Sequence, residues 1–557
     1  MNYKIEGAIR RTRKYFIWLA ILWVFISIVL VMPITVGIHE AEVFKDPGKG
    51  IETAVSLIIH LGQAMKKIQT EGLFIDYIKN IGMFTILYAI LMVIGLIKTA
   101  PKHEYSDMEH GSSDWSKNGE QYTVLNNRKG IILAEDNYLP VDKRGNVNVL
   151  VVGGSGSGKS ASYSIPNAYQ QLGSYVFTDP KGELYDRTAG YLRSNGYEIK
   201  VLNLVRPQYS DGYNPLMHIS SEIDVDVIAN TIVKGQKSDG GGSDPFWDDS
   251  AEMLLKALIY YLMATRPEEE QNLASCAELV RAANSNGGSN LLTELISKLP
   301  YDHPARMNYK SIEIAPEKTY SSILSTLQSK LGKFDSKEIA ELTSTDTINF
   351  NDIGNKKTAV YVISSDTHTA YDFLLTIFFS QMIQQLYNYA DDNGGKLRVP
   401  TYFILDEFAN IGKIPDFDKK ISTSRSRKIS FSVILQNLDQ LEAIYEKSYE
   451  TIIGNCDTHL FLGSNSYKTV EYFSKALGEK TIDRESISVN RDKQHHKTGT
   501  SDSDQVMARA LMTPDELRRL DNDLCIIFEK GIKPVKANKF YYFKHKNIAN
   551  TMARLEM

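Results

Sequence analysis

Residues 147–160 contain the pattern of residue types that binds nucleotide phosphates. An apolar, strand-like run leads into G-x-x-x-x-G-K-S, which ends in Gly158, Lys159 and Ser160. Backbone amides of such a loop cradle phosphates, the lysine reaches the β- and γ-phosphates, and the serine hydroxyl holds Mg²⁺. A chance match in a flexible turn is the alternative, but the pattern requires a strand before the loop, and one is present. The expected cofactor-binding residues are Gly153, Gly154, Ser155, Gly156, Ser157, Gly158, Lys159 and Ser160.

A second apolar run, residues 401–405, ends in the acid pair Asp406 and Glu407. Asp406 would complete the Mg²⁺ shell with Ser160, and Glu407 would polarise the attacking water. An acid pair alone is most often a turn at the end of a strand; together with the loop it predicts catalysis. About 245 residues separate Ser160 from Asp406. A helical insertion would account for this distance and let both motifs lie on neighbouring strands.

A basic turn at residues 422–428 precedes another strand that ends at Gln436. Arg425 or Arg427 could enter a neighbouring subunit's nucleotide site as an arginine finger, which stabilises charge on the transferring phosphoryl group. Gln436 could sense the γ-phosphate. The alternative is structural: solvated arginines at a helix end and a glutamine that caps a strand.

Alternating strands and helices position these residues. Strand-like segments at 174–179 and 198–203 flank a helical stretch at 183–194, and strand and helix resume at 358–364 and 371–390. This alternation indicates an α/β fold with a mostly parallel sheet. Later segments complete the fold: a strand at 459–463, a helix at 467–477, a polar and partly mobile stretch at 479–510, and a closing hairpin of 524–528 with 539–543.

Residues 222–345 interrupt the alternation and carry helical periodicity, so we expect an inserted all-α domain. Helices are predicted from residue 245 and at 272–283, 290–299 and 317–331, after an entry loop at 234–243. Residues 222–341 hold 12 Lys and Arg against 19 Asp and Glu. Such a surface suits a basic protein partner better than DNA phosphates, and an acidic face that binds nothing is an equal alternative.

Two uncharged apolar runs, residues 16–36 and 80–97, are long enough to cross a membrane as helices. Buried helices of a soluble protein are the alternative. Residues 1–100 would form a membrane anchor, with residues 37–79 as an extracytoplasmic loop that carries a short amphipathic helix at 54–68 on the membrane surface. Basic residues before the first run favour a cytoplasmic N-terminus, and a site for a nucleoside triphosphate must also face the cytosol.

The remaining boundaries follow from this division. Residues 101–145 read as a linker with short strands such as 130–133, residues 146–221 and 346–546 as the nucleotide-binding domain, and residues 547–557 as a short tail. The net charge of −4 argues against a protein coated in nucleic acid, and the three isolated cysteines fit a reducing compartment without a zinc site. His495 and His496 are read as part of a solvated loop.

The nucleotide is expected to be ATP, because the chain has neither an LSGGQ-like signature of ABC transporters nor the N-K-x-D with which GTPases recognise guanine. Two spans, a cytosolic α/β motor and an arginine finger together indicate a membrane-anchored ring ATPase.

Several longer segments resemble the TraG/TraD-like conjugative ATPase family, the coupling proteins of type IV secretion systems. The similar segments are HGSSDW (110–115), GIIL (130–133), the phosphate loop, TDPKGEL (178–184), YNPL (213–216), FWDDSAEMLL (246–255), LDEFANIG (405–412), residues 424–428, LQNLDQL (435–441) and MTPDEL (512–517). HGSSDW departs from the family pattern, and the chain ends without the long acidic tail of some members.

The resemblance implies a RecA/FtsK-like P-loop NTPase domain that assembles as a homohexamer around a channel and uses ATP and Mg²⁺. It would sit on the inner or cytoplasmic membrane, deliver relaxase-bound single-stranded DNA to the channel components of a type IV secretion system and power the transfer. The resemblance implies the phosphate, Mg²⁺ and catalytic roles given above for Lys159, Ser160, Asp406 and Glu407. It also favours Arg425 or Arg427 as the arginine finger. Asp179 and Lys181 lie in a family motif near the nucleotide, and no step of the reaction is assigned to them. An FtsK-like translocase of double-stranded DNA and a recruiting scaffold that uses ATP only as an assembly switch are the alternatives.

Overall fold

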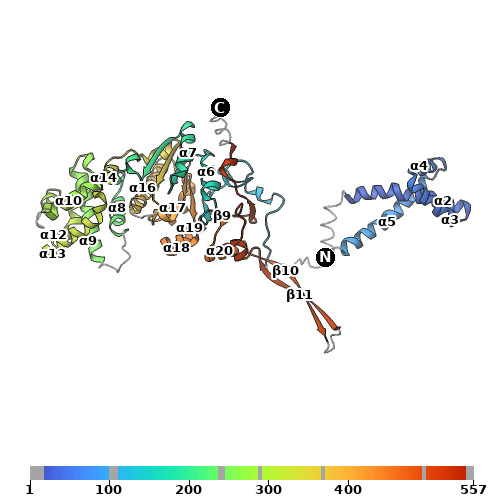
Figure 1. The fold of residues 1–557 in the computed structure, drawn as a ribbon. Helices are drawn as coiled ribbons and strands as arrows, with labels where there is room; N and C mark the ends of the chain where they lie inside the picture. Colours follow the sequence, from blue (N-terminus) through green and yellow to red (C-terminus); the bar gives the residue numbers. More distant parts are fainter. Residues whose placement is uncertain are drawn as a thin grey trace. The chain divides into compact units, whose positions relative to one another are not determined.

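The protein is described by a computed structural model that covers residues 18–98, 111–235, 245–285, 291–365, 371–491 and 497–546. The chain divides into two compact units, residues 1–112 with 480–509, and residues 113–479 with 510–557. Each unit is described by itself below (Figure 1).

The first unit contains two helical stretches that are long and apolar enough to cross a membrane, Trp18–Phe44 and Phe74–Ile94. The first includes the π-helical turn η1 (Ser27–Val31) and α2 (Met32–Phe44), and the second lies in α5 (Phe74–Lys98). The predicted spans at 16–36 and 80–97 therefore fall on real helices, although residues 16 and 17 lie outside the described part. Their predicted ends are wrong, because helical hydrogen bonding continues past the apolar core of each run.

Most of the predicted extramembrane segment 37–79 is also helical. Helices α3 (Pro47–Ile59) and α4 (Leu61–Thr70) replace the expected single helix at 54–68, with a break at His60. Gly37 and Gly50 allow α2 and α3 to pack closely, since a Cβ on either one would lie 2.5 Å from the carbonyl oxygen of the other.

Strands β10 (Glu479–Arg491) and β11 (Lys497–Ala510) pair with each other. The expectation of a partly mobile stretch at 479–510 stays a prediction, because strand pairing does not test mobility.

The second unit is built on a nine-stranded sheet with the order β13-β12-β9-β3-β8-β7-β4-β6-β5. All pairs from β9 to β5 are parallel, and β12 is antiparallel to both of its neighbours. The mostly parallel sheet is thus confirmed. The strands are β3 (Val149–Gly153), β4 (Ser174–Thr178), β5 (Glu198–Asn203), β6 (Thr358–Ile363), β7 (Thr401–Leu405), β8 (Ile429–Leu435), β9 (Thr458–Gly463), β12 (Leu524–Glu529) and β13 (Val535–Asn538).

The side chains of strand β3 show that both faces of this sheet are covered. All its residues are buried, and alternate side chains belong to different cores: Leu150 and Val152 to one, Val149 and Val151 to the other. Helices α6 (Ile165–Ala168) and α7 (Glu183–Ser194) cover the second core, while α16 (Asp372–Asp392) and α17 (Phe417–Thr423) cover the first.

The sheet order corrects the expectation that the phosphate loop and the acid pair lie on neighbouring strands. Strand β3 pairs with β8 and β9, and β8 pairs with β7, so β8 separates the two motifs. Both still reach the same edge of the sheet, because the carboxyl ends of parallel strands lie together.

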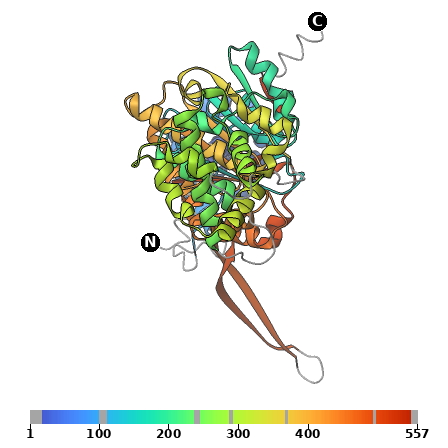
Figure 2. The same cartoon turned by 90° about the vertical axis from the view of Figure 1, so that its left-hand side faces the viewer.

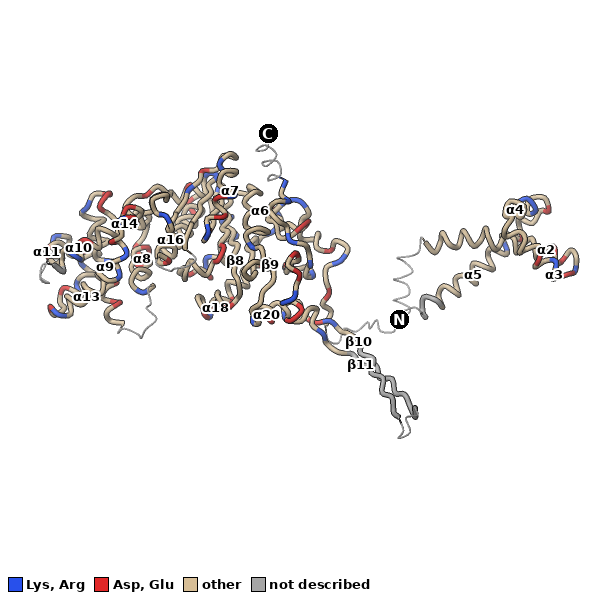
Figure 3. Tube along the Cα trace, viewed as in Figure 1, with Lys and Arg blue, Asp and Glu red and all other residues tan. Residues whose placement is uncertain are grey.

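Helices α8 to α14 occupy the predicted insertion and gather beside the sheet (Figures 1 and 2). Their apolar side chains join the core on one face of the sheet, so the division of this segment into a domain of its own stays a prediction. Acidic and basic residues are interleaved along it (Figure 3). The helices are α8 (Glu222–Lys234), α9 (Pro245–Thr265), α10 (Leu273–Ser285), α11 (Leu291–Ser297), α12 (Pro304–Glu313), α13 (Glu317–Leu331) and α14 (Lys337–Ser344).

Three smaller expectations have mixed outcomes. Strands β1 (Ile131–Ala134) and β2 (Asn137–Leu139) form the expected short ribbon. The closing hairpin exists, but its second strand is β13 and not residues 539–543. The three cysteines are buried free thiols, and the described residues hold no cluster able to bind a metal through His, Cys, Asp and Glu alone; His495 and His496, the entry loop from residue 236 and the tail 547–557 lie outside them.

Candidate nucleotide-binding site

The phosphate loop lies between the carboxyl end of β3 and a helix that begins at Ser160 as the π-helical turn η3 (Ser160–Ser164) and continues as α6. Gly156 and Gly158 have positive φ angles of 75° and 82°, which a residue with a Cβ adopts only with strain. The loop therefore needs glycine at these positions to fold back over the helix N-terminus, where free amide groups attract anions.

Lys159 lies along this loop and is 9% exposed. Its Nζ donates hydrogen bonds to the carbonyl oxygens of Gly153 (2.7 Å) and Gly154 (3.3 Å). Burial lowers the pKa of its ammonium group, and the charges of Asp406 and Glu407 oppose this shift. The lysine is thus held inside the loop by bonds that it would exchange for phosphate oxygens.

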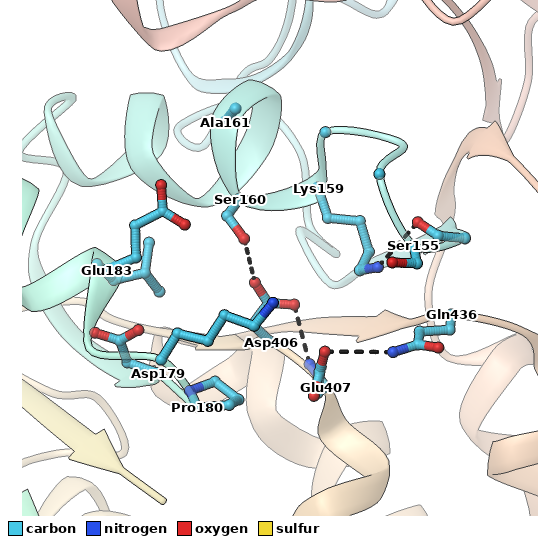
Figure 4. A pocket seen from close by; sticks show the side chains of 15 residues that line it. Ser155, Lys159, Ser160, Ala161, Asp179, Pro180, Glu183, Asp406, Glu407 and Gln436 are labelled. Atoms are coloured by element: carbon cyan, nitrogen blue, oxygen red, sulfur yellow. Dashed lines mark hydrogen bonds between the residues drawn. The ribbon is translucent and has the colours of Figure 1, made fainter. Parts of the chain in front are cut away.

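Ser160 and Asp406 meet across the site although 246 positions separate them in the sequence. The Ser160 Oγ donates to the Asp406 Oδ2 at 2.8 Å (Figure 4), and Thr178 Oγ1 donates to the Asp406 carbonyl at 2.6 Å. Burial raises the pKa of Asp406, while the Ser160 bond and the charge of Lys159 lower it. A hydroxyl and a carboxylate oxygen in one place are ligands that suit Mg²⁺, so the residues fit the expected metal.

Glu407 is held in a left-handed conformation with φ 50° and ψ 50°. Its amide donates to the Asp406 Oδ1 at 3.0 Å, and its carboxylate accepts from Gln436 Nε2 at 3.3 Å (Figure 4). The carboxylate also accepts from Asn410 Nδ2 at 3.0 Å. Backbone strain of this kind persists where surrounding contacts enforce it, and it is common at functional sites. Gln436 directly follows β8, so the intervening strand contributes to the same site.

The site is a pocket that also includes two more acidic residues, Asp179 and Glu183, and a second lysine, Lys181. Asp179 and Lys181, which follow β4, line it with the loop, Asp406, Glu407 and Gln436. Asp179 is 2% exposed and accepts from the Tyr185 amide at 2.8 Å. Burial raises its pKa from 3.8 to about 6, with the nearby Asp406 adding to the shift.

Arg425 and Arg427 do not line this pocket. They belong to the 3₁₀ turn η9 (Ser424–Arg427), which precedes β8, while the pocket lies at the carboxyl end of that strand. Arg427 donates to both oxygens of Asp391 at 2.9 and 2.8 Å and lies 4.6 Å from the ring centre of Tyr387. Arg425 is exposed.

Sequence reasoning missed two groups that position the acid pair, Asn410 and Thr178. Asn410 stands three residues after Glu407 in the turn η8 (Phe408–Ile411), and Thr178 ends β4. The LDEFANIG segment could have pointed to Asn410, whereas only strand pairing brings Thr178 to Asp406.

A mostly parallel sheet with a phosphate loop at the end of β3 and an acid pair at the end of β7 is the arrangement of the P-loop nucleoside triphosphatase fold. Residues 102–556 match the family model described as Type IV secretory system Conjugative DNA transfer. The chain belongs to this family, and the predicted membership among type IV coupling proteins is confirmed.

Relatives and solved structures agree with this assignment. The chain is 24% identical over 509 residues to the conjugal transfer protein TraG of Agrobacterium fabrum, covering 84% of this chain and 75% of that protein. It is also 24% identical over 492 residues to the protein VirD4 of the same organism, covering 82% and 69%. The bacterial conjugative coupling protein TrwBdeltaN70 has a similar fold, with a TM-score of 0.59 at 16% identity over 80% of this chain and 97% of that one. The plasmid coupling protein TrwB has been solved with ADPNP and with ADP and Mg²⁺.

Proposed function

We propose that this coupling protein binds and hydrolyses ATP with Mg²⁺ in the pocket between β3, β8 and β7. One observation carries the proposal: Ser160, Asp406, Glu407 and Gln436 come from three strands and are joined by hydrogen bonds around the phosphate loop. TrwB, whose fold is similar, was crystallised with an ATP analogue and with ADP and Mg²⁺, which supports the same ligands here.

Each residue of this chain has a distinct part in the proposed reaction. The loop amides and Lys159 bind the phosphates, and Ser160 and Asp406 hold Mg²⁺, which neutralises charge on the phosphate oxygens. Glu407 orients the attacking water and accepts its proton, while Gln436 and Asn410 fix the position of its carboxylate. Lys159 exchanges its bonds to Gly153 and Gly154 for phosphate oxygens, whereas the acid pair and its hydrogen bonds are already in place.

We further propose that hydrolysis drives relaxase-bound single-stranded DNA toward a type IV secretion channel from a membrane-anchored homohexamer. Family membership and the two apolar helices Trp18–Phe44 and Phe74–Ile94 support this role. Arg425 is the better candidate for the finger that reaches a neighbouring subunit. It is exposed, whereas the guanidinium of Arg427 is occupied by Asp391 in its own chain.

The test is Glu407→Gln in the full-length protein, with Glu446→Gln as the control. Glu446 is also a glutamate with a positive φ (45°), but it is exposed and does not line the pocket. Glu407→Gln should retain ATP binding while turnover falls by about 10²–10⁴-fold and conjugative transfer is lost. Turnover and transfer at wild-type levels in this variant would refute hydrolysis at this site.

Two further outcomes separate the alternatives. DNA-stimulated turnover that requires duplex and ignores the relaxase would identify a double-strand translocase. ATP binding without any phosphate release in the wild type would identify a scaffold that uses ATP as an assembly switch.

A further inference from the structure

After β13 the chain turns toward the phosphate loop as residues 539–545, KFYYFKH. Lys539 anchors this segment: it is 1% exposed, and its Nζ donates to the carbonyl oxygens of Ser157 (2.8 Å) and Leu462 (2.9 Å). Since Ser157 belongs to the loop, the segment is joined to the loop by a buried, charged hydrogen bond. No residue of this segment takes part in the proposed reaction.

One aromatic ring of the segment lies beside the loop, and a second ring stacks on it. The Tyr541 Cε1 would be 3.6 Å from a Cβ on Gly158, and the Tyr541 hydroxyl donates to Asp523 at 2.9 Å. The Tyr541 ring stacks on Phe543 with their centres 5.5 Å apart and an angle of 5° between planes. Phe543 is 58% exposed. A stacked aromatic pair that begins beside the phosphate loop and ends in an exposed phenylalanine offers a flat apolar surface to a ligand.

The sheet order indicates which part of a nucleotide this surface would meet. The acid pair and Gln436, beside which the proposed reaction places the γ-phosphate, follow β7 and β8 on one side of β3. Strands β9, β12 and β13 lie on the other side of β3, and the aromatic segment continues from β13. A nucleotide whose γ-phosphate points toward β7 and β8 therefore directs its nucleoside end toward the aromatic segment.

We propose that Tyr541 and Phe543 form the surface against which the base of the bound nucleotide stacks. The inference rests on the proposed nucleotide site and assigns a binding surface for the base of that nucleotide. Aromatic side chains stack on the π-faces of bases without the need for a matched set of hydrogen bonds. Tyr541 is oriented by Asp523, and Lys539 holds the segment at a fixed distance from the loop, so the surface exists before the nucleotide binds.

The experiment compares two ligands that share their phosphates and differ in the base, Mg²⁺-ATP and Mg²⁺-tripolyphosphate, by calorimetric titration of the full-length protein in detergent. Tyr541→Ala and Phe543→Ala should each weaken ATP binding by about tenfold, the range found for base stacking, and leave tripolyphosphate binding unchanged. Tyr541→Phe keeps the ring and should bind ATP almost as the wild type does. Tyr209→Ala is the matched control, because Tyr209 is 71% exposed and follows β5 at the opposite edge of the sheet.

Unchanged ATP affinity in both alanine variants would overturn the inference, and so would an equal loss for both ligands, which would place the effect in the loop. Loss of single-stranded DNA binding with ATP affinity intact would overturn it as well and assign the rings to DNA. Photolabelling of the wild type with 8-azido-ATP does not depend on a variant that folds; the label should fall within residues 539–546, and a label confined elsewhere would refute the inference. If the wild type binds neither ligand, the proposed nucleotide site itself fails.

Discussion

Replacing Asp179 by asparagine should stabilise the protein at neutral pH. Its carboxyl group is almost fully buried and lies near Asp406 in the pocket (Figure 4). Burial raises its pKa from 3.8 to about 6. An asparagine Oδ1 can still accept the hydrogen bond from the Tyr185 amide, so the substitution removes the charge and keeps this contact.

The sign and size of the effect follow from the two pKa values. Because the folded pKa is the higher one, the folded state binds more protons than the unfolded state between about pH 4 and 6, and stability falls as pH rises through this window. A shift of about 2 pKa units costs about 3 kcal/mol once Asp179 is ionised. The free energy of unfolding of Asp179→Asn should therefore exceed that of the wild type by about 3 kcal/mol at about pH 7.5, and by roughly half as much at about pH 5.

Urea unfolding of the full-length protein in detergent, followed by tryptophan fluorescence, measures this difference at both pH values. Asp302→Asn is the control, because Asp302 is exposed between α11 and α12 and its replacement should change little at either pH. A variant that is less stable than the wild type at both pH values, or one whose advantage does not grow with pH, would refute the reasoning. ATP turnover of Asp179→Asn should fall if the buried charge is kept for its role in the pocket.

Two other substitutions test the surroundings of the site. Lys539→Met leaves two buried carbonyl oxygens without their donor and should lower the free energy of unfolding by about 2–4 kcal/mol, measured by the same urea titration; wild-type stability would show that the buried ammonium contributes nothing. Arg425→Ala should reduce ATP turnover by about 10³-fold with ATP affinity unchanged, whereas Arg427→Ala should cost about 1 kcal/mol of stability through its lost pair with Asp391 and spare turnover. The reverse result in a turnover assay would assign the finger to Arg427.

Local patterns in the sequence carry much of this structure. Helices α7, α13 and α20 (Tyr467–Leu477) begin and end at the predicted residues, because their apolar periodicity and their flanking turns agree. The strand before the phosphate loop and the strand before the acid pair were also predictable from their unbroken apolar runs, which are typical of strands buried on both faces.

Long-range pairing is what the sequence could not provide. Nothing near residues 429–435 indicates that β8 lies between β3 and β7, since strand order depends on contacts between distant segments. The unbroken aromatic run of residues 540–543 is typical of a strand, but Lys539 turns inward to bond the loop, and the strand pairing ends at Asn538. Residues 479–510 form two strands that pair only with each other, so their polar composition lacks the apolar pattern of strands in a buried sheet.

The charge of the pocket indicates that a triphosphate binds there together with a cation. Four carboxylates, Asp179, Glu183, Asp406 and Glu407, line the pocket with two lysines, Lys159 and Lys181, so the pocket is net negative when all are ionised. A triphosphate would be repelled from such a pocket unless a cation accompanied it. The hydrogen bond between Ser160 and Asp406 brings together the two oxygen ligands for that cation. Burial of Asp179 and Asp406 raises both pKa values in the described structure, and a bound cation would reverse this shift by favouring the charged forms. Binding of Mg²⁺ and ATP, the proposed ligands, would therefore offset the loss of folding stability that the buried carboxylates of Asp179 and Asp406 cause.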